Sequence, residues 1–259
     1  MDFAYPLAGF AVGAIVGITG VGGGSLMTPL LVLLFGIHPA VAVGTDLLYA
    51  AITKAGGTLA HSLKGTVDWK ITRLLATGSI PAAAITLVLV TNFAPGGLKG
   101  ASQVISYALG VALLLTAAAL VLRKKIQAFA LRHAPATPNP RRTEVLTVVT
   151  GAILGVLVSI SSVGAGALGV TALFLLYPAL PAIRVVGSDI AHAVPLTLVA
   201  GLGHWWLGEI DWKLLGSLLV GSLPGIWLGS QVSVKIPERV LRPLLALMLV
   251  LVGAKLIAR

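Results

Sequence analysis

The most constraining feature of this sequence is the absence of any Asp, Glu, Lys or Arg between Asp2 and Asp46. Further long apolar runs cover residues 71–91, 102–122, 214–234 and 241–257. A helix of roughly 20 apolar residues crosses about 30 Å of hydrocarbon. Hydrophobic residues make up 57% of the chain and charged residues only 10%, unlike a soluble domain. The sequence therefore predicts an all-α, polytopic membrane protein.

The charged residues indicate how such a chain is oriented. The first Lys or Arg is Lys54, so the start of the chain lacks the basic region of a cleaved signal peptide and we expect the first apolar segment to remain. The net charge is +10, and basic residues are densest in 123–143, which contains no acidic residue. Cytoplasmic loops carry such an excess of Lys and Arg. We therefore predict a cytoplasmic linker and no nucleic-acid partner. The absence of cysteine excludes disulfides and thiolate metal sites.

The sequence repeats itself on either side of the linker. Adding 143 to the residue number aligns 13 identical residues within the 38 positions from Gly44 to Pro81. The matches include His61 with His204 and a shared Asp-Trp-Lys, so common hydrophobicity is a poor explanation. We predict a first transmembrane repeat in residues 1–122, a basic linker in 123–143 and a second repeat in 144–259.

Each repeat contains five apolar segments. In the first they cover about 3–19, 25–36, 40–62, 71–91 and 102–122; in the second, about 144–161, 166–178, 182–206, 213–234 and 240–257. An odd number of crossings places the halves in opposite orientations, and a re-entrant pair in place of two crossings keeps the number odd. This inverted topology puts most cations on the linker side, in agreement with the positive-inside rule. If the first two segments instead made one broken crossing, the halves would be parallel.

A glycine-rich interruption occurs at corresponding positions of both halves. With an offset of 142, "GVGGGSL" (20–26) aligns with "SVGAGAL" (162–168). Paired Gly-interrupted segments point to a transporter binding site near the bilayer midplane, where helix N-termini attract anions. Close packing of small residues is the alternative interpretation. The predicted substrate-binding residues are Gly22, Gly23, Gly24, Ser25, Thr45, Gly164, Ala165, Gly166 and Ser188.

Ionisable residues inside apolar segments form a second group of candidates. Carboxylates at membrane depth are costly and suggest function, although Asp46 and Asp189 could instead cap the N-termini of their own helices. Lys54 could balance an anion or pair with Asp46. The histidines could carry protons, or His61 and His204 could instead anchor the protein at the membrane interface. Arg184 is expected in a solvated loop. The candidates for proton coupling or charge balance are Asp46, Lys54, His61, Asp189, His192 and His204.

The stretch "GITGVGGGSLMTPLLVLLFGIHPAVAVGTDLLYAAITKAGGTLAH", with its weaker echo after the linker, resembles the TauE/SafE family of sulfite exporter and sulfonate permease proteins. The resemblance covers nearly the whole chain. It implies an anion transporter of the bacterial cytoplasmic membrane that moves sulfite, sulfonates or related sulfur-containing anions. The second half departs from the stronger motif, because Ala165 and Ala167 stand where the first half has Gly23 and Ser25.

Together these patterns predict a secondary transporter that alternates access to an anion site between inverted halves, with an anion channel as the alternative. The sequence contains no HExxH or GxSxG motif, and we predict neither an enzyme nor a cofactor or metal site. The expected partners are a small anionic solute and the lipid bilayer. The sequence leaves the natural solute, the direction of transport, the coupling ion and the oligomeric state open.

Overall fold

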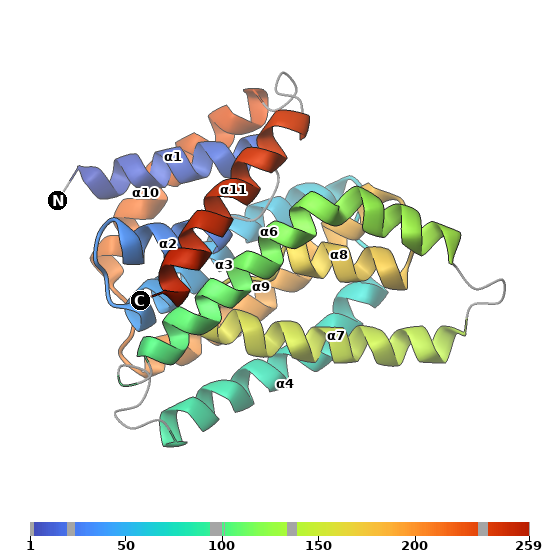
Figure 1. The fold of residues 1–259 in the computed structure, drawn as a ribbon, viewed down its shortest axis with the longest axis horizontal. Helices are drawn as coiled ribbons and strands as arrows, with labels where there is room; N and C mark the ends of the chain where they lie inside the picture. Colours follow the sequence, from blue (N-terminus) through green and yellow to red (C-terminus); the bar gives the residue numbers. More distant parts are fainter. Residues whose placement is uncertain are drawn as a thin grey trace.

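The protein, described by a computed structural model, is a bundle of helices (Figure 1). The structure describes residues 3–19, 24–93, 100, 102–133, 139–232 and 238–258, and these residues contain no β-strand. The first half contributes α1 (Ala4–Thr19), α2 (Gly24–Leu33), α3 (Pro39–Leu63), α4 (Trp69–Phe93) and α6 (Ser102–Arg132). The second contributes α7 (Pro140–Ser161), α8 (Ala167–Leu176), α9 (Ala182–Trp206), α10 (Trp212–Val232) and α11 (Glu238–Ile257). The predicted all-α fold is confirmed.

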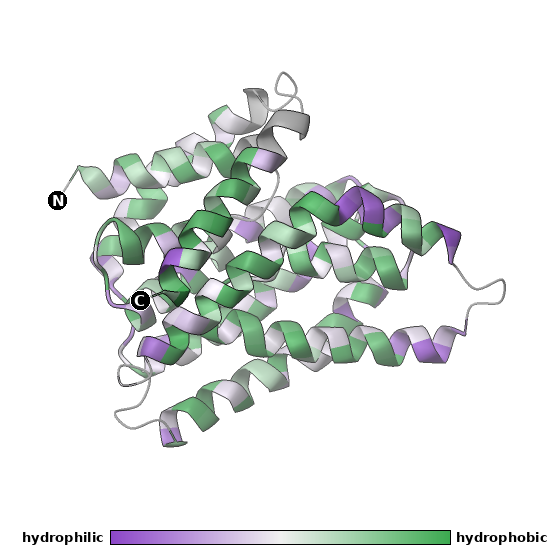
Figure 2. Cartoon of the chain, in the orientation of Figure 1, coloured by the Kyte–Doolittle hydropathy of each residue, from purple (hydrophilic) through white to green (hydrophobic). Residues whose placement is uncertain are grey.

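Several of these helices can cross a bilayer. Among the described residues, α4, α6, α7 and α9 are long and apolar enough to span a membrane. Large apolar side chains such as Ile85, Val121 and Ile153 are exposed on them, and hydrophobic residues cover much of the outer surface of the bundle (Figure 2). Exposed apolar surface of this extent marks a membrane or protein interface, and the length and apolarity of these helices favour a membrane. The prediction of a multi-pass membrane protein is confirmed.

Helix α6 is longer than the apolar segment that predicted it. It continues to Arg132 instead of ending at residue 122, so much of the basic stretch 123–143 is helical. Its Lys, Arg, Gln, Ala and Leu residues are good helix formers, and a helix can continue beyond the hydrocarbon where charges are hydrated. Helix α7 begins at Pro140, and the Asn139 side chain caps it by accepting a hydrogen bond from the Arg142 backbone N–H at 3.1 Å.

The helices that follow the two glycine-rich interruptions are short. Helices α2 and α8 have ten residues each, and a rise of 1.5 Å per residue gives roughly 15 Å, about half of the hydrocarbon thickness. In the second half, Ser162, the residue after α7, is in the left-handed conformation, and Gly164 and Gly166 have φ of 129° and 131°. Such backbone angles favour glycine and turn the chain sharply. Neither short helix can cross the membrane alone.

The most extensive contacts between helices join the first half of the chain to the second. Helix α1 packs on α10, and α4 packs on α7. A methyl group on Gly13 would overlap the backbone of Ser222, and one on Gly155 would overlap the backbone of Ser79. Small residues permit this close approach, as expected for membrane helices. Gly9 and Gly13, four residues apart on α1, both lie against the backbone of α10.

The middle helices of the two halves, α3 and α9, lie against each other in opposite directions. Leu48 lies against Gly201, whereas Ile190 contacts Gly57, so residue numbers rise along one helix as they fall along the other. The contacts between the halves are also reciprocal. The Asp211 N–H donates to Thr45 Oγ1 at 3.2 Å, and the Asp68 N–H donates to Ser188 Oγ at 2.8 Å. The partners in one hydrogen bond are those in the other shifted by 143 residues.

Candidate functional site

The centre of the bundle contains buried ionisable side chains on α3 and α9. Asp46 is 0% exposed, Lys54 8% and Asp189 1%. We call these three residues the Asp–Lys–Asp cluster. Charges so deeply buried are stable only when they are paired or hydrogen-bonded. The cluster therefore defines where polar interactions concentrate in an otherwise apolar bundle.

Asp46 contacts the half-length helix α2. Thr28 on α2 donates a hydrogen bond from Oγ1 to Asp46 Oδ2. Ser162, at the end of α7, also lies close to the Asp46 carboxylate. Asp46 does not cap its own helix, because the N-cap residue of α3 is His38, two turns earlier. The own-helix capping interpretation is therefore wrong for Asp46.

Lys54 lies on α3, in the first half of the chain, and contacts the second half. Its Nζ donates a hydrogen bond of 3.1 Å to the backbone carbonyl of Ala165, inside the second glycine-rich interruption. The same ammonium group interacts electrostatically with both Asp189 and Asp46. The prediction left open whether Lys54 pairs with Asp46 or serves an anion. In the structure Lys54 bonds to Ala165 and makes no direct ion pair with either carboxylate, although its charge acts on both.

Asp189 lies at the N-terminal end of α8. A methyl group on Gly169, in the first turn of α8, would overlap Asp189 Oδ1, and the carboxylate lies near the backbone amide of Gly166. Neither Asp189 oxygen has a hydrogen-bond partner of ordinary geometry among the described residues. The N-cap residue of α9 is Pro181, so the own-helix capping interpretation is wrong for Asp189 as well.

The histidines occupy different environments. His192 is buried, and its Nε2 shares a 2.8 Å hydrogen bond with Ser79 Oγ on α4. His204 is also fully buried and bonds through Nε2 to the Ser159 carbonyl at 2.9 Å. His61 is partly exposed and bonds to Thr66 in the α3–α4 turn at 2.8 Å. An interface anchor fits His61 but is wrong for His204, because the contact of α9 with α7 encloses that ring.

Several predicted substrate-binding residues lie elsewhere. Thr45 and Ser188 bond to the turns of the opposite half, because each precedes its Asp and points about 100° away around the helix. Gly22 and Gly23 lie outside the described residues, whereas Gly24 and Ser25 begin α2. Gly164, Ala165 and Gly166 form the turn that leads into α8 beside Lys54 and Asp189.

Two hydroxyl residues beside the cluster, Thr28 and Ser162, were missed by sequence reasoning. Thr28 lies one turn after Ser25, and Ser162 begins the second interruption. Helical periodicity from Ser25 would have singled out Thr28, since residues three apart share a helix face. Ser162 carried a weaker signal, because nothing in the sequence shows that it faces Asp46.

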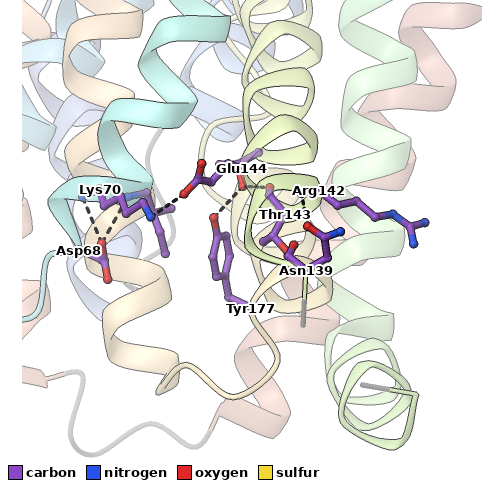
Figure 3. Close-up of polar contacts among 9 residues, drawn as sticks. Asp68, Lys70, Asn139, Arg142, Thr143, Glu144 and Tyr177 are labelled. Carbon is purple, nitrogen blue, oxygen red and sulfur yellow. Dashed lines mark hydrogen bonds and ion pairs between the residues drawn. The ribbon is translucent and has the colours of Figure 1, made fainter. Parts of the chain in front are cut away.

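A separate charged region lies at one end of the bundle (Figure 3). There Lys70 on α4 pairs with Glu144 on α7, and the Arg184 guanidinium lies 3.4 Å from Asp68. Thr147 and Tyr177 share a 2.8 Å hydrogen bond at the same end. Lys70 and Arg184 lie at the end of the bundle where α7 begins, next to the basic linker. Arg184 is half-exposed, as expected for a solvated residue, and is not part of the central cluster.

The fold and the site together define a class. A multi-pass helical protein with two half-length helices that meet buried charges is organised as a membrane transporter, in which broken helices surround a central site. The model of the sulfite exporter TauE/SafE family matches residues 5–256. The chain therefore belongs to this family, and the resemblance predicted from the glycine-rich motif is confirmed.

Relatives from distant organisms have consistent names. The chain is 38% identical to the probable membrane transporter protein YjnA of Bacillus subtilis, over 99% of this chain and 100% of the relative. It is 28% identical to YdhB of the same organism over 90% of this chain and 91% of the relative, and 25% identical to MJ0441 of Methanocaldococcus jannaschii over 95% and 92%. Both are also named probable membrane transporter proteins. No solved structure matches the chain significantly. These names indicate a transporter rather than an enzyme.

Proposed function

We propose that this protein is a secondary transporter of small sulfur-containing anions, such as sulfite or an alkylsulfonate, in the bacterial cytoplasmic membrane. The observation that carries the proposal is the meeting of α8, a half-length helix, with Lys54 and Asp189 at the centre of the bundle. The family description supports the class of solute.

The chemistry of the site suits an oxyanion. A sulfite or sulfonate head presents three acceptor oxygens, and the N-terminus of a helix offers backbone N–H donors with a partial positive charge. The N-cap residue of α8 is Gly166, which has no side chain that could occupy these donors. Lys54 places its Nζ beside them, where the ammonium form can attract an anion. These groups can bind an anion through several moderate interactions, which is what reversible transport needs.

The arrangement of the halves supports alternating access. The antiparallel packing of α3 and α9 and their reciprocal contacts support halves that are inverted repeats. Inverted repeats of this kind expose a central site alternately to the two sides. With about 100 mV inside negative, the exit of one negative charge is favoured by roughly 2.3 kcal/mol. Export of an anion that crossed without a compensating charge would therefore run downhill, whereas uptake needs a coupled cation such as a proton.

Flux into liposomes tests the proposal. We expect purified protein to take up labelled sulfite and methanesulfonate but not chloride, with uptake accelerated when unlabelled sulfite is present inside. That acceleration is the mark of a carrier. Rapid flux that includes chloride and shows no acceleration would establish an anion channel. Folded protein that moves none of these anions would overturn the sulfur-anion assignment.

The orientation of the repeats has its own test, which the absence of cysteine makes simple. Lys70 and Lys213 occupy equivalent positions at the starts of α4 and α10, and both are exposed. We expect an impermeant maleimide to label the Lys70→Cys variant only from the cytoplasmic side and the Lys213→Cys variant only from outside. Labelling of both variants from one side would show that the halves are parallel. The cysteine-free parent is the control.

A further inference from the structure

The Asp–Lys–Asp cluster breaks the symmetry of the two halves. The position equivalent to Lys54 in the second half is Thr197, whose hydroxyl bonds to its own helix at the Ala193 carbonyl, 2.8 Å away. Lys54 instead reaches across to the other half, to Ala165 at the entry to α8. The two halves therefore contribute unequally, and the positive charge is directed to the α8 side of the site.

The two carboxylates also differ in their partners. Asp46 accepts a hydrogen bond from Thr28 and has Ser162 beside it. Both Asp189 oxygens are buried and, within the described part of the chain, neither has a hydrogen-bond partner. A buried carboxylate oxygen without a hydrogen bond is costly; among the described residues, Asp46 has one such oxygen, Oδ1, and Asp189 has two, so the Asp189 carboxylate is the less firmly held.

The surroundings of Asp189 contain few charges. Lys54 faces it from α3, and α8 presents the backbone of Gly166 and Gly169. On α9 itself, His192 lies one turn later, also interacts with Lys54 and is bonded to Ser79 of α4. Asp46 approaches the same ammonium group from its own side. Within the cluster, one cation therefore serves two carboxylates, and an anionic solute would add a third negative charge.

We propose that Asp189 is the proton carrier of this transporter and that the anion takes the place of its charge between Lys54 and the N-terminus of α8. This inference rests on the proposed function and deepens it by naming the coupling ion and the residue that binds it. The Asp189 carboxylate and the anionic solute compete for the same positive groups, Lys54 and the N-terminus of α8. The anion therefore binds more readily once a proton has neutralised Asp189.

The cycle balances both charge and protons. A proton from the water on one side binds the Asp189 carboxylate, the neutral acid no longer competes for Lys54, and the anion binds beside α8. After the site opens to the other side, the anion leaves and the proton follows it into that solution. One proton therefore moves with each anion in the same direction, and transport of a monovalent anion carries no net charge.

The test compares wild-type protein with Asp189→Asn, which imitates the neutral acid and cannot release a proton. Methanesulfonate is the probe in liposomes, because its single negative charge does not change with pH. With a lumen one pH unit more alkaline than the bath, we expect wild-type protein to accumulate it up to about tenfold, since each proton contributes one tenfold concentration ratio. A membrane potential of about 100 mV, imposed alone, should leave the wild-type ratio near one.

For Asp189→Asn we expect the reverse behaviour. The pH gradient should produce no accumulation, whereas the potential should drive up to about a fifty-fold ratio, because the variant moves one uncompensated charge. Exchange of labelled for unlabelled anion should persist, which also shows that the variant is folded. Asp46→Asn is the matched control and should remain driven by the pH gradient, whatever its rate.

The outcomes separate this inference from the proposed function. Accumulation driven by the pH gradient in Asp189→Asn would overturn the inference, as would loss of that drive in Asp46→Asn alone. Wild-type protein that responds to the potential and ignores the pH gradient would also overturn it, while leaving the transporter assignment intact. If the protein accepts sulfite but not methanesulfonate, the lumenal pH is measured during equal uptake of sulfite by wild type and variant. Sulfite binds protons to the same extent in both, so a difference in lumenal pH reports the protons that Asp189 carries. Absence of flux for both anions would count against the proposed function itself.

Discussion

Replacing Lys54 by methionine is expected to abolish transport and to destabilise the protein. The change keeps the approximate length of the side chain but leaves the Asp46 and Asp189 carboxylates without the ammonium group that faces both. Because Lys54 makes no direct ion pair with either carboxylate, we expect a cost below the roughly 3–5 kcal/mol typical of breaking a buried ion pair. Thermal unfolding in detergent and sulfite flux in liposomes measure the two effects.

Two further variants separate charge from packing. Lys54→Arg keeps the cation and should retain most of the stability, with altered affinity because the planar guanidinium cannot occupy the place of the Nζ bonded to Ala165. The double change Lys54→Met with Asp189→Asn removes one charge of each sign and should recover stability without transport. A Lys54→Met protein with wild-type stability and affinity for sulfite would show that the cluster has neither role.

The second large effect is expected from Gly169→Ala. The added methyl group would overlap Asp189 Oδ1, so either the carboxylate or the start of α8 must move. Insertion of a methyl group into a tightly packed site costs about 1–3 kcal/mol, and a displaced Asp189 could no longer face Lys54. We expect at least a tenfold loss of flux together with a lower unfolding temperature, and the loss of flux corresponds to about 1.4 kcal/mol or more in the transport barrier.

Gly56→Ala is the matched control. Gly56 lies inside α3, and a methyl group there would meet nothing within 4 Å. Alanine is the better helix former, so this variant should be as stable as wild type or slightly more so, with normal flux. Equal behaviour of the Gly56 and Gly169 variants would mean that the contact between Gly169 and Asp189 is unimportant.

The parts of the fold that follow from hydrophobic pattern and repetition could be predicted. The ten apolar segments became ten described helices, and the aligned segments 40–62 and 182–206 became α3 and α9, which differ by 143 residues at both ends. The extension of α6 to Arg132 was missed because a loss of hydrophobicity marks the edge of the bilayer, not the end of a helix. Charged residues that favour helix look like a linker when hydropathy alone is considered.

The sequence predicted several residues of the candidate site but not the contacts that they make. Asp46, Lys54, Asp189 and the second interruption do come together. Thr45 instead bonds to a turn of the opposite half, and Thr28 was overlooked. Neighbouring residues on a helix point in directions about 100° apart, so the face that turns toward the centre depends on how the helices pack. Sequence proximity to Asp46 therefore could not identify its partners.

The glycine-lined helix pairs have a consequence for how the chain is assembled. Helix α1 of the first half lies along α10 of the second, and α7 of the second lies along α4 of the first, with backbones in close contact. The first helix of each half therefore packs against a helix of the other half. An exchange of identical elements between two partners is the arrangement of a domain-swapped dimer. The two helix pairs resemble such an exchange within a single chain, because the first helix of each half packs mainly on the other half.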